Sequence, residues 1–285
     1  MNPQIEKRIR QSIADLSACQ IETSSYEIKF LLAEVLNCEV GDVLSYSNEM
    51  TKQQLKQFEK FISMRHQHIP ADKIIGHKGF YKHEFSVNYD VLSPRSDTEI
   101  LVEATIEKVR ANNCKTILEL GVGSGCVILS IRSDCKQLFG TGIDISTAAL
   151  AVTQKNASAM GLSKRLSLRQ ADWFASNFVD QLETKFDIIV SNPPYICSDE
   201  IKSLATEVRE YDPIIALDGG KDGLDSYRRI AELVPYLLNE GGYICLEVGE
   251  NQAHDVSDLF MSVGLKPEKI IKDFSDIERC VIIKK

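Results

Sequence analysis

From about residue 97 onward, the chain alternates between short apolar runs rich in β-branched residues and segments with helical periodicity. Such an alternation predicts a mainly parallel β-sheet whose two faces are both covered by helices. Helices are expected at Ala148–Met160 and at Ser226–Leu238, where Pro235 predicts either a kink or a late start. The expected strands are Thr116–Leu120, Phe139–Asp144, Leu166–Asp172, Phe186–Ser191 and Tyr243–Val248.

The end of the sequence departs from this alternation. Lys269–Phe274 and Cys280–Ile283 both have strand character, and the turn between them is too short to contain a crossover helix. We therefore expect these last two strands to be antiparallel neighbours in a sheet that is otherwise parallel. The fold class predicted for this part of the chain is α/β.

The first part of the chain has helical patterns only. A serine or threonine is followed three residues later by glutamate or glutamine at 24–27, 51–54 and again at 96–99, and this spacing predicts the start of a helix. Apolar side chains then recur at helical spacing, which predicts the core of a small helical bundle. These side chains are Ile5, Ile9, Ile13 and Leu16 in one stripe, and Leu55, Phe58 and Ile62 in another.

Residues 73–92 have a third character, because aromatic and β-branched residues stand there among glycines. This composition predicts a short β-hairpin. A chain of 285 residues is long for one domain and short for two large ones. The expected organisation is a helical N-terminal domain at residues 1–72, a hairpin linker at 73–95 and an α/β domain at 96–285.

The composition restricts the classes of partner. A net charge of −8 gives no sign of the basic face that long nucleic acids require, so we expect no direct binding of them. The eight cysteines include no Cys-x-x-Cys pair, and no histidine pair has metal-ligand spacing, so we expect isolated thiols and no metal site. No apolar run has transmembrane length, and the expected location is the cytoplasm, with no membrane partner.

A glycine-rich turn directly follows the first expected strand and comprises Gly121, Val122, Gly123, Ser124 and Gly125. Glycines at such a place let the chain turn tightly and let a ligand approach the backbone closely. The spacing is Gly-x-Gly-x-Gly and no lysine follows, which excludes a phosphate-binding loop of the Walker kind. The alternative is a turn that serves only the fold.

Two further strand ends carry residues suited to a nucleoside. Asp144 ends the next strand, where a carboxylate can accept hydrogen bonds from both hydroxyls of a ribose, although it could also cap the helix that follows. Asp172 and Trp173 stand at the end of the third strand, and a carboxylate beside an aromatic ring suits the amino group and the face of an adenine. A merely buried tryptophan is the alternative. Because ligands bind at the carboxyl ends of strands in open α/β sheets, we expect these residues to share one site.

The most specific motif is Asn192-Pro193-Pro194-Tyr195, at the end of the fourth expected strand. The Asn192 side-chain oxygen and the Pro193 main-chain carbonyl can accept the two N–H groups of a planar NH2. Two such acceptors would favour a transition state in which that nitrogen becomes positive, as it does during methylation. Tyr195 would offer a ring face to the substrate or to a cationic methyl donor. Seen alone, the tetrapeptide could also be a simple turn.

These residues resemble the class I S-adenosyl-L-methionine-dependent methyltransferases, and most closely the family that methylates the glutamine of the Gly-Gly-Gln motif in peptide-chain release factors. The resemblance covers nearly the whole chain. The matching strings are Ser93-Pro94-Arg95, Asp97-Thr98-Glu99, Glu119 to Gly125, Gly142 to Ser146, Asp172-Trp173-Phe174, Asn192 to Ile196, Tyr211-Asp212-Pro213, Ala216-Leu217, Gly219-Gly220, Asp222-Gly223-Leu224, and Leu246 to Gly249 with Gln252.

The resemblance implies a Rossmann-like sheet of seven strands, with an antiparallel last strand and an N-terminal helical domain that docks the release factor. It implies donor contacts at residues 121–125, Asp144, Trp173 and Asn192, a substrate glutamine held by residues 192–195, and S-adenosyl-L-homocysteine as the product. The sequence departs from the family pattern at two places. Ser96 stands where a proline is usual, and the turn at residues 273–279 lacks its usual glycine.

Three other functions compete with this interpretation. An adenine-N6 DNA methyltransferase uses a similar clamp on a flipped base, but it would need a basic target-recognition region. A glutamine methyltransferase that acts on a ribosomal protein is closer and harder to separate. A binding module that keeps the donor pocket without catalysis belongs to a different class, and the intact Asn192 argues against it.

Overall fold

The computed structural model describes residues 2–182 and 184–285, which form two compact units. The first unit runs to His77 and also includes Thr206–Tyr211, a segment that is distant in the sequence. The second unit consists of Lys78–Ala205 and Asp212–Lys285. The first unit therefore takes up one helix from the half of the chain that builds the sheet.

The first unit is a bundle of helices. Its core contains the predicted stripe residues Ile5, Ile9 and Leu16, all buried, together with Phe58. Thr51 and Gln54 form both hydrogen bonds of a capping box, which confirms that prediction. The elements are α1 (Pro3–Ala18), α2 (Ser25–Leu36), a 3₁₀ helix (Val40–Ser45), α3 (Lys52–Arg65), α4 (Ala71–Ile75) and α8 (Thr206–Tyr211).

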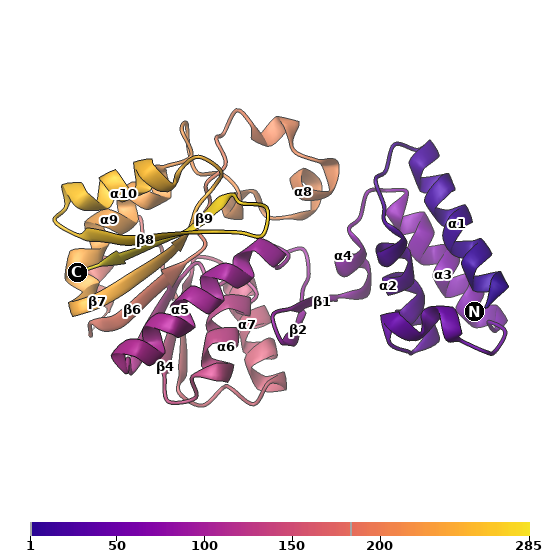
Figure 1. Ribbon diagram of the computed structural model, residues 1–285, viewed down its shortest axis with the longest axis horizontal. Helices are drawn as coiled ribbons and strands as arrows, with labels where there is room; N and C mark the ends of the chain where they lie inside the picture. The colour runs from indigo at the N-terminus through magenta and orange to yellow at the C-terminus, as the bar shows by residue number, and fades with distance from the viewer. Residues whose placement is uncertain (1, 183) are drawn as a thin grey trace. The chain divides into compact units, whose positions relative to one another are not determined.

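The second unit is built on a seven-stranded sheet with the order β5-β4-β3-β6-β7-β9-β8 (Figure 1). The first five strands in this order pair in parallel, whereas β9 is antiparallel to both β7 and β8. The predicted α/β class, the seven strands and the antiparallel strand near the end are confirmed. The strands are β3 (Thr116–Leu120), β4 (Phe139–Asp144), β5 (Leu166–Gln170), β6 (Phe186–Ser191), β7 (Leu238–Glu247), β8 (Lys266–Lys272) and β9 (Glu278–Lys284).

Helices cover both faces of this sheet. Neighbouring strand residues point to opposite faces, so Ile117 and Ile188 join one buried cluster, while Leu118 and Ile189 join the other. The first cluster packs against α5 (Glu99–Asn112), α6 (Cys126–Asp134) and α7 (Thr147–Ala159). The second packs against α9 (Asp225–Leu237) and α10 (Ala253–Ser262). Short 3₁₀ turns lie at Ser96–Thr98, Val179–Gln181, Ile201–Ser203 and Ile214–Ala216.

A two-stranded hairpin of β1 (His77–Phe80) and β2 (His83–Ser86) precedes the sheet. Phe80 and Phe85 are buried in the first cluster, with their rings edge to face at 6.0 Å between centroids. In the described part of the chain, no helix combines the length and the apolar character needed to cross a membrane. All eight cysteines are free thiols.

One predicted helix start is wrong. Ser96 does not cap α5, which begins three residues later at Glu99 after a 3₁₀ turn and has no side-chain cap. Glu99, the second residue of the predicted pair, has another partner, because its carboxylate accepts a hydrogen bond from the backbone N–H of Tyr81. Thr98, the residue directly before α5, accepts a hydrogen bond from Asn192 through its hydroxyl.

Several element ends also differ from the expectation. Strand β5 ends at Gln170, two residues before Asp172, and β7 starts at Leu238, directly after α9. Helix α9 starts at Asp225 and contains Pro235 near its C-terminus, so the proline does not delay its start. The turn without glycine closes because Asp276 takes a left-handed conformation (φ 64°), while the Asp273 carboxylate accepts hydrogen bonds from the N–H groups of Ser275 and Ile277.

Candidate active site

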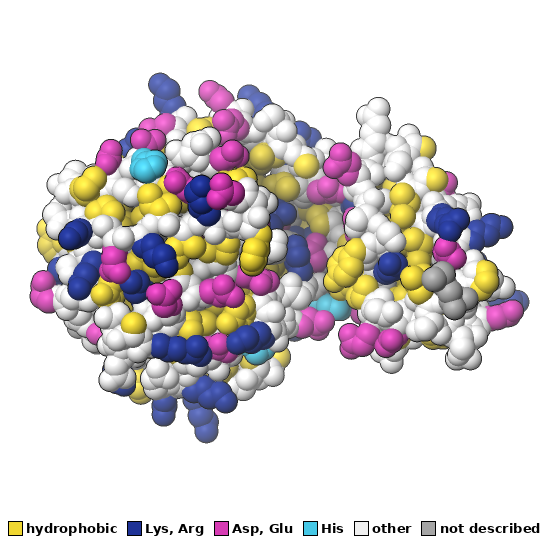
Figure 2. All heavy atoms as spheres, in the orientation of Figure 1, with side chains coloured by type: hydrophobic (Ala, Val, Ile, Leu, Met, Phe, Trp, Pro, Cys, Tyr) yellow, Lys and Arg dark blue, Asp and Glu magenta, His cyan; other side chains and the backbone are white. Residues whose placement is uncertain are grey.

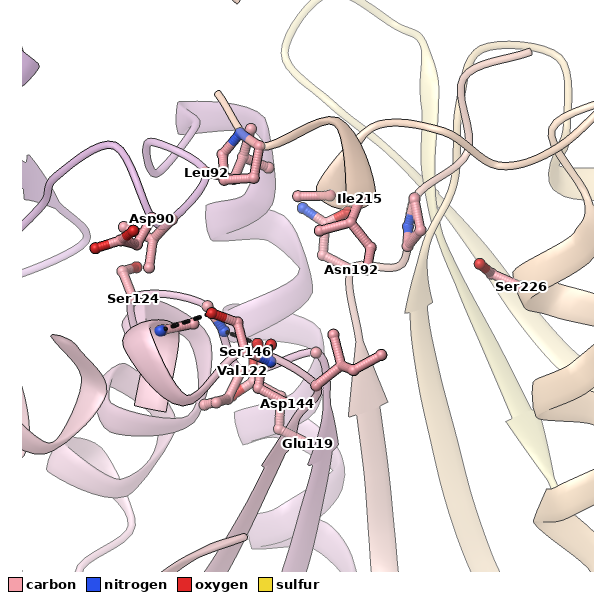
Figure 3. Close-up of a pocket in the computed structure, with 18 of the residues that line it drawn as sticks. Asp90, Leu92, Glu119, Val122, Ser124, Asp144, Ser146, Asn192, Ile215 and Ser226 are labelled. Carbon is pink, nitrogen blue, oxygen red and sulfur yellow. Dashed lines mark hydrogen bonds between the residues drawn. The ribbon is translucent and has the colours of Figure 1, made fainter. Parts of the chain in front are cut away.

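A cavity of about 680 Å³ opens at the carboxyl ends of the parallel strands, entirely within the second unit (Figure 3). Its walls come from segments that are far apart in the sequence. Most predicted site residues line it, but Gly125, Pro193 and Tyr195 do not. Those that line it are Gly121, Val122, Gly123, Ser124, Asp144, Asp172, Trp173, Asn192 and Pro194.

The glycine turn forms one wall of the cavity. Gly121 needs to be a glycine, because it has φ +77° and a Cβ atom there would lie 3.1 Å from the Trp173 ring. The backbone N–H groups of Gly121 and Val122 donate to the carbonyl of Ile143, which fixes the turn against β4. Gly125, the last residue of the turn, is the N-cap residue of α6, so its position is determined by the start of that helix.

Asp144 connects the turn to the next helix. One carboxylate oxygen accepts from the Gly123 N–H at 2.9 Å, and the other accepts from the Ser146 N–H at 2.9 Å. The cap of α7 is Ser146, whose hydroxyl accepts from the N–H of Ala149. The carboxylate therefore fixes the glycine turn to the loop before α7. Asp144 also lines the cavity, and each of its oxygens keeps a further lone pair for a ligand.

Asp172 and Trp173 follow β5 on the side of the cavity beyond β4. The Asp172 carboxylate accepts from the N–H of Phe174, and the Trp173 carbonyl accepts from Arg229 of α9. Trp173 is half-buried against the second apolar cluster, while Phe174 is 51% exposed. The tryptophan thus packs on one side and lines the cavity on the other.

Asn192 leaves β6 at the edge of the cavity. Its side-chain NH2 donates to the Thr98 hydroxyl at 3.3 Å, which ties the amide to the turn before α5. Pro194 lines the cavity, whereas Pro193 is buried and is not among the lining residues. The asparagine therefore stands in the same cavity as the glycine turn and Asp144 (Figure 3).

Tyr195 is not among the residues that line the cavity, and its predicted contact with the substrate stays a prediction. The ring packs beside Gly249, where an added Cβ would lie 3.0 Å from it, and its backbone carbonyl accepts from Gln252. Burial, with a further contribution from nearby Glu247, raises the pKa of its hydroxyl to about 12. In this position Tyr195 supports the loop that carries Asn192.

Several lining residues were given no role from the sequence. Glu119 is buried beneath the glycine turn, where burial raises the pKa of its carboxyl well above the ordinary value, and it accepts from the N–H of Ile128. Ile214 and Ile215 line the cavity and are 56% and 59% exposed. In the sequence, only the family string Tyr211-Asp212-Pro213 pointed to the segment that contains these two isoleucines. The buried Asp212 accepts hydrogen bonds from the lining residues Ser93 and Arg95.

Within the described ranges, no group of three or more potential ligand side chains could hold a metal ion. The site is therefore built from backbone amides, carboxylates, aromatic rings and one side-chain amide.

Comparison with known proteins gives a consistent result. Residues 8–76 match the model of the PrmC N-terminal domain, and residues 96–208 match that of the methyltransferase small domain. The chain is 39% identical to a release factor glutamine methyltransferase of Rhodospirillum rubrum, over 95% of this chain and 82% of that protein. It is 35% identical to a release factor glutamine methyltransferase of Cereibacter sphaeroides, over 96% of this chain and 95% of that protein.

Among solved structures, the hMettl16 catalytic domain, in complex with the MAT2A 3'UTR hairpin 6, shares the fold. Its TM-score is 0.54 at 10% sequence identity, over 70% of this chain and 74% of that one. This likeness concerns the fold alone. The identity to the curated relatives extends over almost the whole sequence and includes both units. The chain therefore belongs to the family of release factor glutamine methyltransferases.

Proposed function

We propose that this chain transfers a methyl group from S-adenosyl-L-methionine to the side-chain nitrogen (N5) of the glutamine in the Gly-Gly-Gln motif of peptide-chain release factors. Relatives that carry the name of this activity support the proposal. The observation that carries the chemistry is the position of Asn192, which shares one cavity with Asp144 and the glycine turn.

The residues around the cavity fit the donor. A volume of about 680 Å³ falls within the range of small-molecule sites. The Asp144 carboxylate would hold the ribose hydroxyls, Asp172 and Trp173 would hold the adenine, and the backbone of residues 121–125 would approach the rest of the molecule closely. When bound, the donor supplies an electrophilic methyl group on a positively charged sulfur and leaves as S-adenosyl-L-homocysteine.

The protein's own contribution is the position of the glutamine amide. An amide nitrogen is a weak nucleophile because its lone pair is delocalised into the carbonyl group. The Asn192 side-chain oxygen and the Pro193 carbonyl would each accept one N–H, which fixes the plane of the amide and points its nitrogen at the methyl carbon. Positive charge develops on these N–H groups as the N–C bond forms and the S–C bond breaks. The two acceptors therefore stabilise the transition state more than the ground state, and one N–H proton is released afterwards.

We assign the docking of the protein substrate to the helical residues 1–72 and the location to the cytoplasm, where release factors act. Direct binding of long nucleic acid is not part of the proposal. The net charge is −8, and positive and negative side chains are intermixed on the face drawn in Figure 2. A DNA methyltransferase would need a continuous basic surface instead.

The test is incubation of the purified chain with labelled S-adenosyl-L-methionine and a purified release factor, followed by mass mapping of the modified residue. A ribosomal protein and duplex DNA are offered in parallel. We expect label on the Gly-Gly-Gln glutamine only, and label on either competitor alone would refute the assignment.

Asn192→Ala is expected to abolish turnover and to change donor affinity, measured by calorimetry, by less than about tenfold, because the clamp acts mainly on the substrate amide. Asn177→Ala provides a control at an exposed asparagine outside the cavity. Equal turnover in the Asn192 variant and the wild type would remove the clamp from the mechanism.

A further inference from the structure

The clamp requires that the Asn192 amide has one particular orientation. The oxygen and the NH2 of an asparagine side chain have nearly the same shape, and a half-turn about the last bond exchanges them. With the oxygen toward the cavity, Asn192 can accept an N–H from a substrate amide. With the NH2 toward the cavity, Asn192 would place a hydrogen-bond donor against the substrate N–H, which is also a donor, and no hydrogen bond could form. Something in the fold must therefore select one orientation.

Thr98 alone cannot make this selection. Its hydroxyl lies 3.3 Å from the Asn192 Nδ2 atom and is buried at 2% exposure. A hydroxyl can both donate and accept, so it could satisfy either end of the amide. The orientation of the Asn192 amide therefore depends on whether another group accepts the hydrogen bond that the Thr98 hydroxyl donates.

Glu247 is the group in the right place. It is the last residue of β7, and the parallel register pairs Ser191 with Leu246, so Asn192 and Glu247 come next on adjacent strands. Its side chain is 3% exposed, and its Oε2 atom has no hydrogen-bond partner among the described residues. Thr98 and Asn192, which hydrogen-bond each other, both act on this carboxylate and oppose the rise of its pKa. An ionised carboxylate only accepts hydrogen bonds, which distinguishes it from the hydroxyl.

We propose that Glu247 is a positioning residue that, through Thr98, holds the Asn192 NH2 away from the cavity and so turns the Asn192 oxygen toward the substrate. The carboxylate accepts a hydrogen bond from the Thr98 hydroxyl. The lone pairs of that hydroxyl oxygen are then available to accept a hydrogen bond from the Asn192 N–H. The inference rests on the proposed function for the identity of the group that the oxygen then accepts.

The protonation state of Glu247 connects this arrangement to pH. Burial raises the pKa of this carboxyl from 4.5 to about 7, against the opposing effects of Thr98, Arg279 and Asn192. Once protonated, Glu247 can donate to Thr98, and the hydroxyl can then donate to the Asn192 oxygen, which favours the wrong orientation. The polar and titratable groups that interact electrostatically with Glu247 are Asp97, Thr98, Cys126, Asn192, Tyr195, Tyr227, Arg279 and Cys280.

The same pKa shift determines the sign of the effect on stability. Because the folded-state pKa lies above the ordinary value, the folded protein prefers the protonated form of Glu247. Its contribution to stability is fully present below about pH 4.5 and is lost as the pH rises through about 7. Catalysis requires the ionised form of Glu247. We therefore expect kcat to rise as the pH increases through about 7, while this contribution to stability falls.

The decisive experiment uses Glu247→Gln in the full chain. Glutamine offers both a donor and an acceptor, so it no longer selects one orientation. We expect kcat to fall at least tenfold with donor KM nearly unchanged, and we expect the rise of wild-type kcat near pH 7 to disappear. The unfolding midpoint at pH 8 should be equal or higher, because no charge is buried. A merely structural role would instead lower stability and activity together.

A second readout needs no turnover. In protein with ¹⁵N-labelled asparagine, the Asn192 side-chain signals, identified by their loss in Asn192→Asp, should shift between pH 6 and 8 in the wild type but not in Glu247→Gln. Asp187→Asn is the matched control, since it removes a carboxylate from the opposite end of β6 and should leave the titration intact.

Signals that do not move with pH in the wild type, or that move equally in Glu247→Gln, would overturn the inference. Wild-type protein that fails to methylate a release factor would overturn the proposed function while leaving this titration as an independent result. Thr98→Val should reproduce the loss of kcat, and Thr98→Ser should restore most of it, because serine keeps the hydroxyl. Full activity in Thr98→Val would also contradict the proposal.

Discussion

Asp144 holds two parts of the site together through one carboxylate. It accepts from the N–H groups of Gly123 and Ser146, and it lines the cavity. Asp144→Ala should therefore weaken S-adenosyl-L-methionine binding by about 10- to 100-fold, because hydrogen bonds to a charged group contribute about 1.5–3 kcal/mol. Calorimetric titration of the donor measures the loss, with Asp180→Ala as an exposed control. Unchanged affinity would contradict the assignment of this residue to the ribose.

Gly219 is a steric constraint on the clamp loop. A Cβ atom there would lie 2.7 Å from the Tyr195 Cα atom and 2.9 Å from the Pro194 carbonyl oxygen. Gly219→Ala should displace this loop, lowering kcat and costing about 1–3 kcal/mol in the free energy of unfolding, as overpacking does. Gly41→Ala adds its methyl group to open space and serves as the control. If the Gly219 variant kept wild-type turnover, the loop would have to be more adaptable than its contacts indicate.

The residues of the site were predictable where one short string both shapes the backbone and carries the chemistry. Gly121 to Ser124, Asp144 and Asn192 were singled out in this way, and all of them line the cavity. The packing of Tyr195 was not predictable, because its neighbours Gly249 and Gln252 are distant in the sequence. For the same reason, no local pattern could reveal that Thr98 and Glu247 lie beside Asn192.

At the scale of elements, the periodicity of the sequence predicted the strands well, since β3, β4 and β6 begin and end at the expected residues. The capping spacing succeeded at Thr51 and failed at Ser96. The difference comes from tertiary hydrogen bonds. The Thr51 and Gln54 side chains each accept from the other residue's backbone N–H, whereas the Glu99 carboxylate accepts from the backbone N–H of Tyr81 in the hairpin.

Helix α9 ends against Lys285, which directly follows β9, the strand next to β7. The Lys285 ammonium donates to the carbonyls of Pro235 and Leu238 at 2.7 and 2.9 Å, so it caps the helix at its junction with β7. Lys285→Met should lower the free energy of unfolding by about 0.5–2 kcal/mol, because it removes a cation from a helix C-terminus. Urea unfolding measures the change, and Lys266→Met at an exposed position provides the control. Equal midpoints in the two variants would show that the cap contributes nothing.

At the scale of the whole molecule, Arg65 organises the first unit. Its guanidinium is 2% exposed and pairs with Glu27 of α2 and, at 2.6 Å, with Glu207 of α8, while also donating to the Ile69 carbonyl. Arg65→Ala would leave both carboxylates without their partner. The expected loss is about 3–5 kcal/mol in unfolding free energy, which is typical when a buried ion pair loses one member.

Chemical denaturation measures this loss, and limited proteolysis should show faster cleavage near residues 204–212. Arg10→Ala is the matched control, because its pair with Glu6 lies on the surface and its side chain is 76% exposed. Wild-type stability of the Arg65 variant would mean that α8 is held by other contacts.

Helix α8 also determines how the molecule can be divided. Its Glu207 and Tyr211 bond to Arg65 and to the Gln67 carbonyl, yet the chain on both sides of it belongs to the sheet-bearing unit. A single cut after His77 therefore does not release two self-sufficient pieces. A fragment that starts at Lys78 would carry an orphaned helix next to Asp212, the carboxylate that braces the cavity wall, and adding the missing bundle as a separate polypeptide should repair that defect.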